Sequence, residues 1–233
     1  MVDVLVLWDV DHTLVDTGGV GRDAYDLAFR RLFGRESVAQ PPMAGRTDRA
    51  ITLDMLRFNG VEPTEAHLDA LRAAAEIALD ELAPLLPTRG RALPGAADAL
   101  RAMRAEPVVQ SLLTGNVRRF AEVKIGPFGL VEYLDLDAGA YGWSHSVRAR
   151  LVDVARTAAG LRYATTFSGR ATVLVGDTPL DVEAALATGA SVIAVATGRY
   201  SVAKLAAAGA HLVLPDLSGT REVLAAVRHV AAA

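Results

Sequence analysis

The chain has 233 residues, of which 52% are hydrophobic and 22% are charged, so it can bury the core of one large domain or of two modest ones. Its net charge of -3 gives no basic surface for nucleic acid, and its apolar runs are too short to span a membrane, so we expect neither as a partner. It contains no cysteine, which excludes disulfides and thiolate metal sites. Because no segment reads as a secretory leader, we expect a soluble cytoplasmic protein. We also expect it to act as a monomer or a homodimer.

The first segment, VDVLVLWDV over residues 2–10, is apolar without alternation, which predicts a buried central strand. Residues 15 to about 88 show helical periodicity instead, and the predicted helices cover 22–34, 47–60 and 63–86. In the second of these, Thr47 is expected to be the N-cap and Gly60 the C-terminal stop. The segment LPTRGRALPG, residues 86–95, has the prolines and glycines of a return hinge.

From residue 90 onward, short apolar runs alternate with amphipathic stretches of helix length, which indicates a parallel sheet covered by helices on both faces. The predicted strands are 108–113, 133–138, 171–176, 191–196 and 211–215, and 223–233 is expected to form a closing helix. The fold class is therefore predicted as α/β, a Rossmann-like doubly wound parallel sheet. Its core would comprise residues 1–14 and 90–233, with an inserted α-helical cap at 15–89.

Polar residues follow three of the predicted strands, at the edge where open parallel sheets bind ligands. Four carboxylates would converge there, and that much desolvated negative charge favours a bound cation. Oxygen ligands of this kind suit Mg²⁺, which also recruits phosphate oxygens. The residues in question are Asp9, Asp11 and Thr13 after the first strand, Thr114, Gly115 and Asn116 after 108–113, and Asp177, Thr178 and Asp181 after 171–176.

The three motifs DVDHT (9–13), LLTGN (112–116) and VGDTPLD (175–181) resemble, in this order, those of the haloacid dehalogenase superfamily of phosphohydrolases. The cap position is similar to that of the phosphoglycolate phosphatase-like branch, and the resemblance covers essentially the whole chain. Each motif alone also has a structural reading, as a turn or a helix start, so the ordered set carries the resemblance. One departure is His12, which stands where the family usually has glycine.

The resemblance implies a reaction in two steps on a small phosphomonoester. Asp9 would attack phosphorus and form an aspartyl-phosphate, and Asp11 would protonate the leaving oxygen and then deprotonate the attacking water. Mg²⁺ would be held by the Asp9 side chain, the Asp11 backbone carbonyl and Asp177. Asp181 would support it directly or through a neighbour.

The resemblance also implies roles in binding. Thr114 and the backbone N–H groups beyond it, at Gly115 and Asn116, would bind the phosphoryl oxygens, while Thr13 would orient the nucleophile loop. Arg46, in the cap segment MAGRTDRAI (43–51), is a candidate for the distal anionic group of the substrate, or else a solvated loop arginine.

Other functions on the same fold remain open from the sequence. A β-phosphoglucomutase-like phosphosugar mutase would also keep Asp11, and a non-catalytic regulator that binds Mg²⁺ or phosphate is a third hypothesis. Phosphonoacetaldehyde hydrolases are disfavoured, because they use a cap lysine and residues 15–88 contain none.

The cation that neutralises the nucleophile is the least determined part of the site. The family usually supplies a lysine before the helix that precedes the metal-motif strand, and this chain has none there. Arg148, in the first turn of that helix, is the favoured replacement. Lys124 is the rival candidate for this cation. It shares a helical stripe with Val117, Phe120 and Ala121, and its helix is expected on the face of the sheet opposite to that of the family's usual lysine. A structural role for both residues is the remaining alternative.

Overall fold

The computed structural model describes residues 3–232, so residues 1, 2 and 233 of the predicted core lie outside the described part. The core is a six-stranded sheet in the order β5-β4-β1-β6-β7-β8, and every strand pair in it is parallel. Strand order reverses at the central β1, so the predicted doubly wound α/β fold is confirmed. The strands are β1 (Val4–Trp8), β4 (Val108–Thr114), β5 (Ala140–Tyr141), β6 (Thr172–Gly176), β7 (Ser191–Val195) and β8 (Leu212–Leu214).

Helices cover both faces of this sheet. Val6 and Trp8 of β1 point to one face and Leu5 and Leu7 to the other, as the strand period of two requires. The first face packs against α5 (Ala96–Met103), α6 (Arg118–Ile125) and α10 (Thr220–Ala232). The second packs against α7 (Arg148–Tyr163), α8 (Pro179–Ala187) and α9 (Val202–Ala207). Helices α6 and α7 therefore approach the site from opposite faces.

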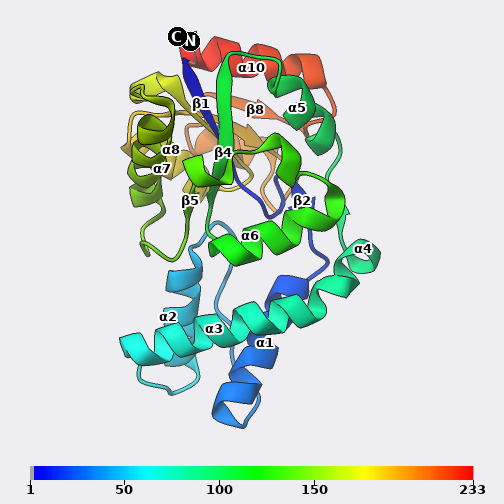
Figure 1. Cartoon of the computed structure of the whole chain (residues 1–233), viewed down its shortest axis with the longest axis vertical. Helices are drawn as coiled ribbons and strands as arrows, with labels where there is room; N and C mark the ends of the chain where they lie inside the picture. The colour runs from blue at the N-terminus through cyan, green and yellow to red at the C-terminus, as the bar shows by residue number, and fades with distance from the viewer. Residues whose placement is uncertain (1–2, 233) are drawn as a thin grey trace.

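The segment between β1 and α5 is mainly helical and lies beyond the carboxyl ends of the strands (Figure 1). It contains α1 (Val20–Phe33), α2 (Asp48–Phe58), α3 (Glu65–Leu82), the 3-10 turn η1 (Ala83–Leu85) and α4 (Leu86–Arg89). Thr47 is the N-cap of α2, since its side chain accepts a hydrogen bond from the Ala50 N–H, and Gly60 follows the helix with a φ of 69°. The apolar core of this cap also takes in Val117 and Phe120 from the core side, so α6 is packed against both units.

Two short strands join the cap to the core. β2 (Val15–Asp16) pairs antiparallel with β3 (Arg91–Ala92), so the outgoing and returning chains lie side by side. Gly90 lies so close to the outgoing chain that a Cβ there would be 2.7 Å from the Asp16 carbonyl oxygen. The predicted return hinge over 86–95 thus folds as α4 followed by β3.

The predicted strand at 133–138 is wrong. The segment forms two 3-10 turns, η3 (Val131–Tyr133) and η4 (Leu136–Ala138), and the sheet edge is taken by Ala140–Tyr141. The Asp135 carboxylate accepts a hydrogen bond from the Asp137 N–H at 3.1 Å and so starts η4. A side chain that bonds its own backbone in this way competes with a strand ladder. Short 3-10 turns also occur at η2 (Gly126–Phe128) and η5 (Gly169–Ala171).

No helix in residues 3–232 combines the length and the apolar character needed to cross a membrane.

Candidate active site

The three sequence motifs meet at the carboxyl ends of β1, β4 and β6. Asp9 follows β1, Thr114 ends β4 and Asp177 follows β6, and all three side chains are buried. They line a cavity of about 780 Å³ whose wall is completed by residues of the cap. The sheet edge predicted from the sequence is therefore where the structure gathers the site.

An acidic cluster lies at this edge. One carboxylate oxygen each from Asp9, Asp177 and Asp181 lie within 4.8 Å of one another. Burial raises the pKa of Asp177 to about 9, and the carboxylates of Asp181 and Asp9 add to the rise. The Oδ1 atom of Asp177 is buried without a hydrogen-bond partner among the described residues. Buried carboxylates with a free oxygen are suitable ligands for a divalent cation such as Mg²⁺.

Asp181 is already engaged on both of its oxygens. Its Oδ2 accepts hydrogen bonds from the Thr178 N–H at 3.0 Å and the Thr178 hydroxyl at 2.7 Å, in a capping box that starts α8. Its Oδ1 lies 2.6 Å from Nη2 of Arg148. Asp181 thus holds Thr178 and Arg148 in place beside the acidic cluster. Asp177 has the carboxylate that is freer to bind a cation.

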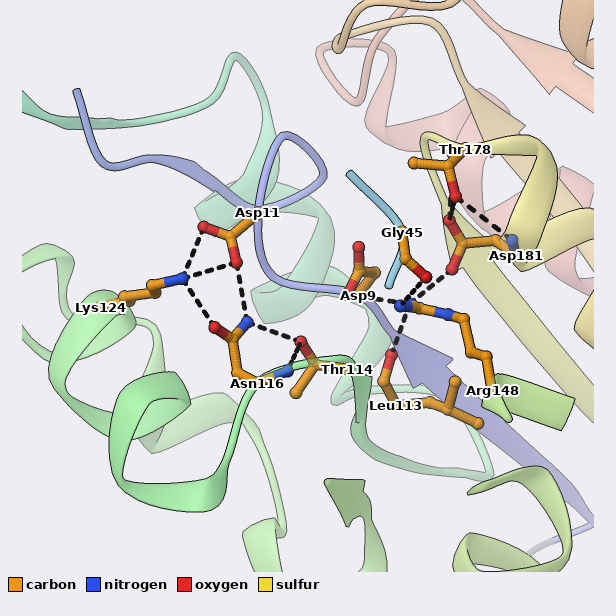
Figure 2. A network of polar contacts seen from close by, with 10 residues as sticks. All are labelled: Asp9, Asp11, Gly45, Leu113, Thr114, Asn116, Lys124, Arg148, Thr178 and Asp181. Atoms are coloured by element: carbon orange, nitrogen blue, oxygen red, sulfur yellow. Dashed lines mark hydrogen bonds and ion pairs between the residues drawn. The ribbon is translucent and has the colours of Figure 1, made fainter. Parts of the chain in front are cut away.

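Arg148 is the cation beside Asp9. Its Nη2 lies 3.0 Å from the Asp9 Oδ1 and also donates to the Leu113 carbonyl at 3.2 Å, while Nη1 donates to the Gly45 carbonyl at 3.2 Å (Figure 2). Burial acts to lower the pKa of Arg148, but Asp181 and Asp9 together raise it above its usual value, so the guanidinium stays charged. One buried arginine therefore connects the nucleophile candidate with a backbone carbonyl of the cap.

Burial raises the pKa of Asp9 to about 6, against the opposing effect of the Arg148 guanidinium. A cation bound at the acidic cluster would favour the ionised form of Asp9 further. The carboxylate form is the one that can act as a nucleophile.

Lys124 pairs with Asp11 and not with Asp9. Its Nζ lies 2.9 Å and 2.7 Å from the two oxygens of Asp11 and 2.6 Å from the Asn116 Oδ1 (Figure 2). Burial raises the pKa of Asp11, but the Lys124 ammonium and the hydrogen bonds from Lys124 and Asn116 bring it below its usual value. The two cations considered from the sequence thus serve two different carboxylates.

The motif at the end of β4 also contacts the Asp11 carboxylate. The Asn116 amide nitrogen donates to Asp11 Oδ2 at 2.7 Å and to the Thr114 hydroxyl at 2.8 Å. Gly115 lies against the cap, and a Cβ there would overlap the Arg46 carbonyl oxygen. Only glycine leaves room for this approach.

Thr13 and His12 belong to the loop that follows Asp9 at the end of β1. Thr13 is fully buried and its hydroxyl has no hydrogen-bond partner among the described residues. His12 has a φ of 58°, the left-handed conformation that favours glycine, and its carbonyl accepts a hydrogen bond from the Thr197 hydroxyl. The loop therefore keeps a glycine-like backbone even though the residue is histidine.

Arg46 is held within the cap. Its Nη2 lies 2.6 Å from the Asp54 carboxylate, and Nη1 donates to the Pro42 carbonyl at 3.2 Å. A contact with the distal group of a substrate would compete with Asp54, so the distal role of Arg46 stays a prediction.

Sequence reasoning missed Asp48, the first residue of α2. Its carboxylate accepts a hydrogen bond from the Val117 N–H at 2.7 Å, and its own N–H donates to the Gly115 carbonyl at 2.6 Å. Burial raises the pKa of Asp48 to about 6. In the sequence, an acid in the first turn of a helix indicates only dipole complementation, and no signal shows that this one is buried.

The parallel sheet, the cap inserted after its first strand and the acids at the strand ends define a capped α/β protein with an acidic site. A family model described as haloacid dehalogenase-like hydrolase matches residues 6–186. The chain therefore belongs to the haloacid dehalogenase-like hydrolases. No curated protein matches it.

Solved structures share the fold over nearly the whole chain. A hydrolase from Pseudomonas syringae is 19% identical with a TM-score of 0.68, and the match covers 96% of this chain and 98% of that one. A protein from Bacteroides vulgatus, provisionally described as a β-phosphoglucomutase, is 18% identical with a TM-score of 0.68 and coverage of 98% and 90%. A predicted phosphoglycolate phosphatase from Haemophilus somnus is 15% identical with a TM-score of 0.65 and coverage of 95% and 97%. At these identities the likeness shows the fold alone.

Proposed function

We propose that the protein is a Mg²⁺-dependent phosphomonoesterase that acts on a small phosphorylated metabolite through an aspartyl-phosphate on Asp9. One observation carries the proposal: the Asp9 carboxylate is paired with Arg148 beside the Asp177 carboxylate, and it lines the same cavity as Asp11. In the proposed reaction Asp9 would be the nucleophile, Asp11 the acid and base, and Asp177 a ligand of the cation, around one cavity. Membership of a hydrolase family supports the same reading.

In the first step, a carboxylate oxygen of Asp9 attacks phosphorus. The bond between phosphorus and the leaving oxygen breaks with its electron pair on that oxygen, which takes a proton from Asp11 and departs as an alcohol. In the second step, Asp11 takes a proton from a water molecule whose oxygen attacks phosphorus. The bond to Asp9 breaks, inorganic phosphate forms, and both carboxyl groups return to their starting state.

Charge neutralisation makes a carboxylate nucleophile sufficient. Arg148 holds Asp9 through Nη2, and the Thr114 hydroxyl with the N–H groups of Gly115 and Asn116 would bind the transferred phosphoryl oxygens. The side chains of Asp9 and Asp177 and the backbone carbonyl of Asp11 would hold the metal, with Asp181 supporting through Thr178 and Arg148. Mg²⁺, when bound, supplies neutralisation of the phosphoryl charge.

The cavity limits the substrate. A cavity of about 780 Å³, lined by residues of both the core and the cap, has the size of a site for a small metabolite and not for a folded phosphoprotein. Closure by the cap would also exclude water other than the attacking molecule. We therefore expect a small phosphomonoester as the partner.

Hydrolysis of p-nitrophenyl phosphate tests the proposal. We expect turnover with Mg²⁺, its loss with EDTA, and its return when Mg²⁺ is added in excess. A panel of small phosphomonoesters, scored for free phosphate, would then identify the substrate class. No turnover despite Mg²⁺ binding would point to a regulator, and transfer between positions of a phosphosugar without free phosphate would point to a mutase. Either result would overturn the phosphatase proposal.

A further inference from the structure

The ion pair between Lys124 and Asp11 is built into the protein, and it is not a surface contact. Lys124 lies in the last turn of α6 and its side chain is only 7% exposed, whereas the Asp11 side chain is 36% exposed and lines the cavity. Lys124 thus holds Asp11 from the buried side. The other side of the carboxylate stays open to a substrate.

Asn116 completes the hold on Asp11. Its amide oxygen accepts a hydrogen bond from Lys124, and its amide nitrogen donates to Asp11 and to the Thr114 hydroxyl (Figure 2). Two donors therefore converge on Asp11 Oδ2, and the lysine also reaches Oδ1. Several charge-assisted hydrogen bonds from fixed donors restrict the rotation of a carboxylate.

The cap leaves room for this lysine. A Cβ at Gly21, in α1 of the cap, would lie 3.1 Å from Lys124 Cε and 3.2 Å from Nζ. The ammonium also lies 5.8 Å from the centroid of the Phe120 ring. A lysine enclosed in this way does not extend to bulk water, so the snorkelling expected of a long stem on an apolar stripe does not apply.

We propose that Lys124 is a positioning residue that, together with Asn116, holds the Asp11 carboxyl group against the leaving oxygen of the substrate. The inference deepens the proposed function and rests on it. The pairing with the nucleophile belongs to Arg148, so Lys124 does not act as the cation of the phosphoryl group. Lys124 and Asn116 favour the carboxylate form of Asp11, so the proton that Asp11 gives to the leaving oxygen would come from the monoanion of the bound phosphomonoester. The effect of Lys124 runs through this proton transfer as the bond to phosphorus breaks.

This role predicts that the effect of replacing Lys124 depends on the leaving group of the substrate. The p-nitrophenolate ion departs readily without a proton, whereas the benzyl alcohol oxygen needs one. A misplaced Asp11 therefore slows phosphoenzyme formation from benzyl phosphate far more than from p-nitrophenyl phosphate. Loss of a phosphoryl-binding cation, or a general loss of folding, would slow both substrates alike.

The test compares kcat/KM for these two substrates of similar size, since this ratio reports the steps up to departure of the leaving group. For Lys124→Met we expect a fall of about 100-fold with benzyl phosphate and of less than about 10-fold with p-nitrophenyl phosphate, in the range of general acid catalysis. Asp11→Asn should show the same difference between substrates. Lys204→Met, at the other lysine of the chain, which is exposed on α9, is the matched control and should change neither value.

Equal losses with the two substrates, or no loss, in Lys124→Met would overturn the inference. If Lys124→Met does not fold, Gly21→Ala decides, because its added methyl would lie 3.1 Å from Lys124 Cε and 3.2 Å from Nζ and must shift the end of the side chain while the lysine remains. It should give the same difference between the substrates at smaller size. Equal effects on the two substrates, or no effect, would overturn the inference. Failure of the wild type to hydrolyse either substrate would overturn the proposed function itself, which separates the two failures.

Discussion

Arg148 contacts more residues of the candidate site than the sequence motifs indicate. It lies within 3.0 Å of Asp9 and 2.6 Å of Asp181, and it also donates to the Leu113 and Gly45 carbonyls. A planar guanidinium suits this set of acceptors, because its donors point in several fixed directions. Lysine at the same position would reach only part of it.

Replacement of Arg148 should therefore be costly. We expect Arg148→Ala to lower kcat by about 100-fold to 1000-fold at saturating Mg²⁺, because electrostatic stabilisation of this kind typically has that value. Arg148→Lys should retain an intermediate rate. Steady-state kinetics would measure both, with circular dichroism to show that the fold is intact. A kcat near that of the wild type in Arg148→Ala would refute the assignment.

Asp48 is a buried carboxyl group that the folded protein holds with a pKa raised to about 6, from an ordinary value of 3.8. Between these values the folded state binds more protons than the unfolded one, so stability from this group is full below about pH 4 and falls as pH rises through 6. The loss amounts to about 3 kcal/mol at neutral pH. Asp48→Asn should remove it.

We expect the melting temperature of Asp48→Asn to exceed that of the wild type at pH 8, and the difference to vanish near pH 4. Thermal melts across this range measure it. Asp54→Asn is the control on the same helix, where the carboxylate is part-exposed and pairs with Arg46. A melting temperature of Asp48→Asn that falls below the wild-type value at pH 8 would contradict the expected sign of the effect.

At the scale of elements, strand ends were predictable from the sequence and helix faces were not. Asp9, Asp11 and Asp177 follow apolar runs, so their convergence follows from the parallel sheet alone. The pairing of Lys124 with Asp11 depends on how far α6 lies from β1, and the burial of Asp48 depends on how the cap seats on the core. Neither distance is encoded in local periodicity. The strand predicted at 133–138 failed because apolar alternation did not reveal the local hydrogen bond of Asp135.

The loop after β4 and the cap loop before α2 meet through Gly115. An added Cβ would overlap the Arg46 carbonyl oxygen, so Gly115→Ala must separate the two loops. We expect kcat/KM to fall by at least about 10-fold because catalytic geometry tolerates little displacement. Gly126→Ala is the control, since no atom lies within 4 Å of the added methyl. Equal activity of the two variants in the hydrolysis assay would show that this contact does not matter for catalysis.

At the scale of the whole molecule, binding of Mg²⁺ at the acidic cluster would raise the stability of the folded state. A ligand that binds only the folded state at 100 times its Kd stabilises it by about 2.7 kcal/mol. For a chain of this length that corresponds to a rise in melting temperature of about 5 to 10 °C. We expect MgCl₂ to give such a rise over EDTA in the wild type.

Asp177→Asn should abolish this Mg²⁺-dependent shift. In EDTA it should melt higher than the wild type, because folding no longer has to bury and protonate a carboxyl group whose pKa rises to about 9. Differential scanning fluorimetry gives both values from one set of samples. A Mg²⁺ shift that survives Asp177→Asn would place the metal elsewhere.

The overall architecture was predictable because the helical insertion directly after the first strand interrupts an otherwise regular alternation. The position of the cap on the core was not predictable, because it depends on backbone contacts such as the hydrogen bond from the Asp48 N–H to the Gly115 carbonyl. Backbone groups are the same in nearly every residue, so the sequence does not show which of them will pair. The cavity between the two units, on which the proposed size of the substrate rests, could be obtained only from the structure.

The central claim is that Asp9 forms a covalent phosphoenzyme. Rapid acid quench of the Asp11→Asn variant during turnover of p-nitrophenyl phosphate with Mg²⁺, followed by peptide mass spectrometry, tests it most directly. We predict the mass of one added phosphoryl group on the peptide that contains Asp9, and no such addition in Asp9→Asn, which should also lose turnover. Turnover in Asp9→Asn at the wild-type rate, or a phosphoryl group on another residue, would contradict the mechanism.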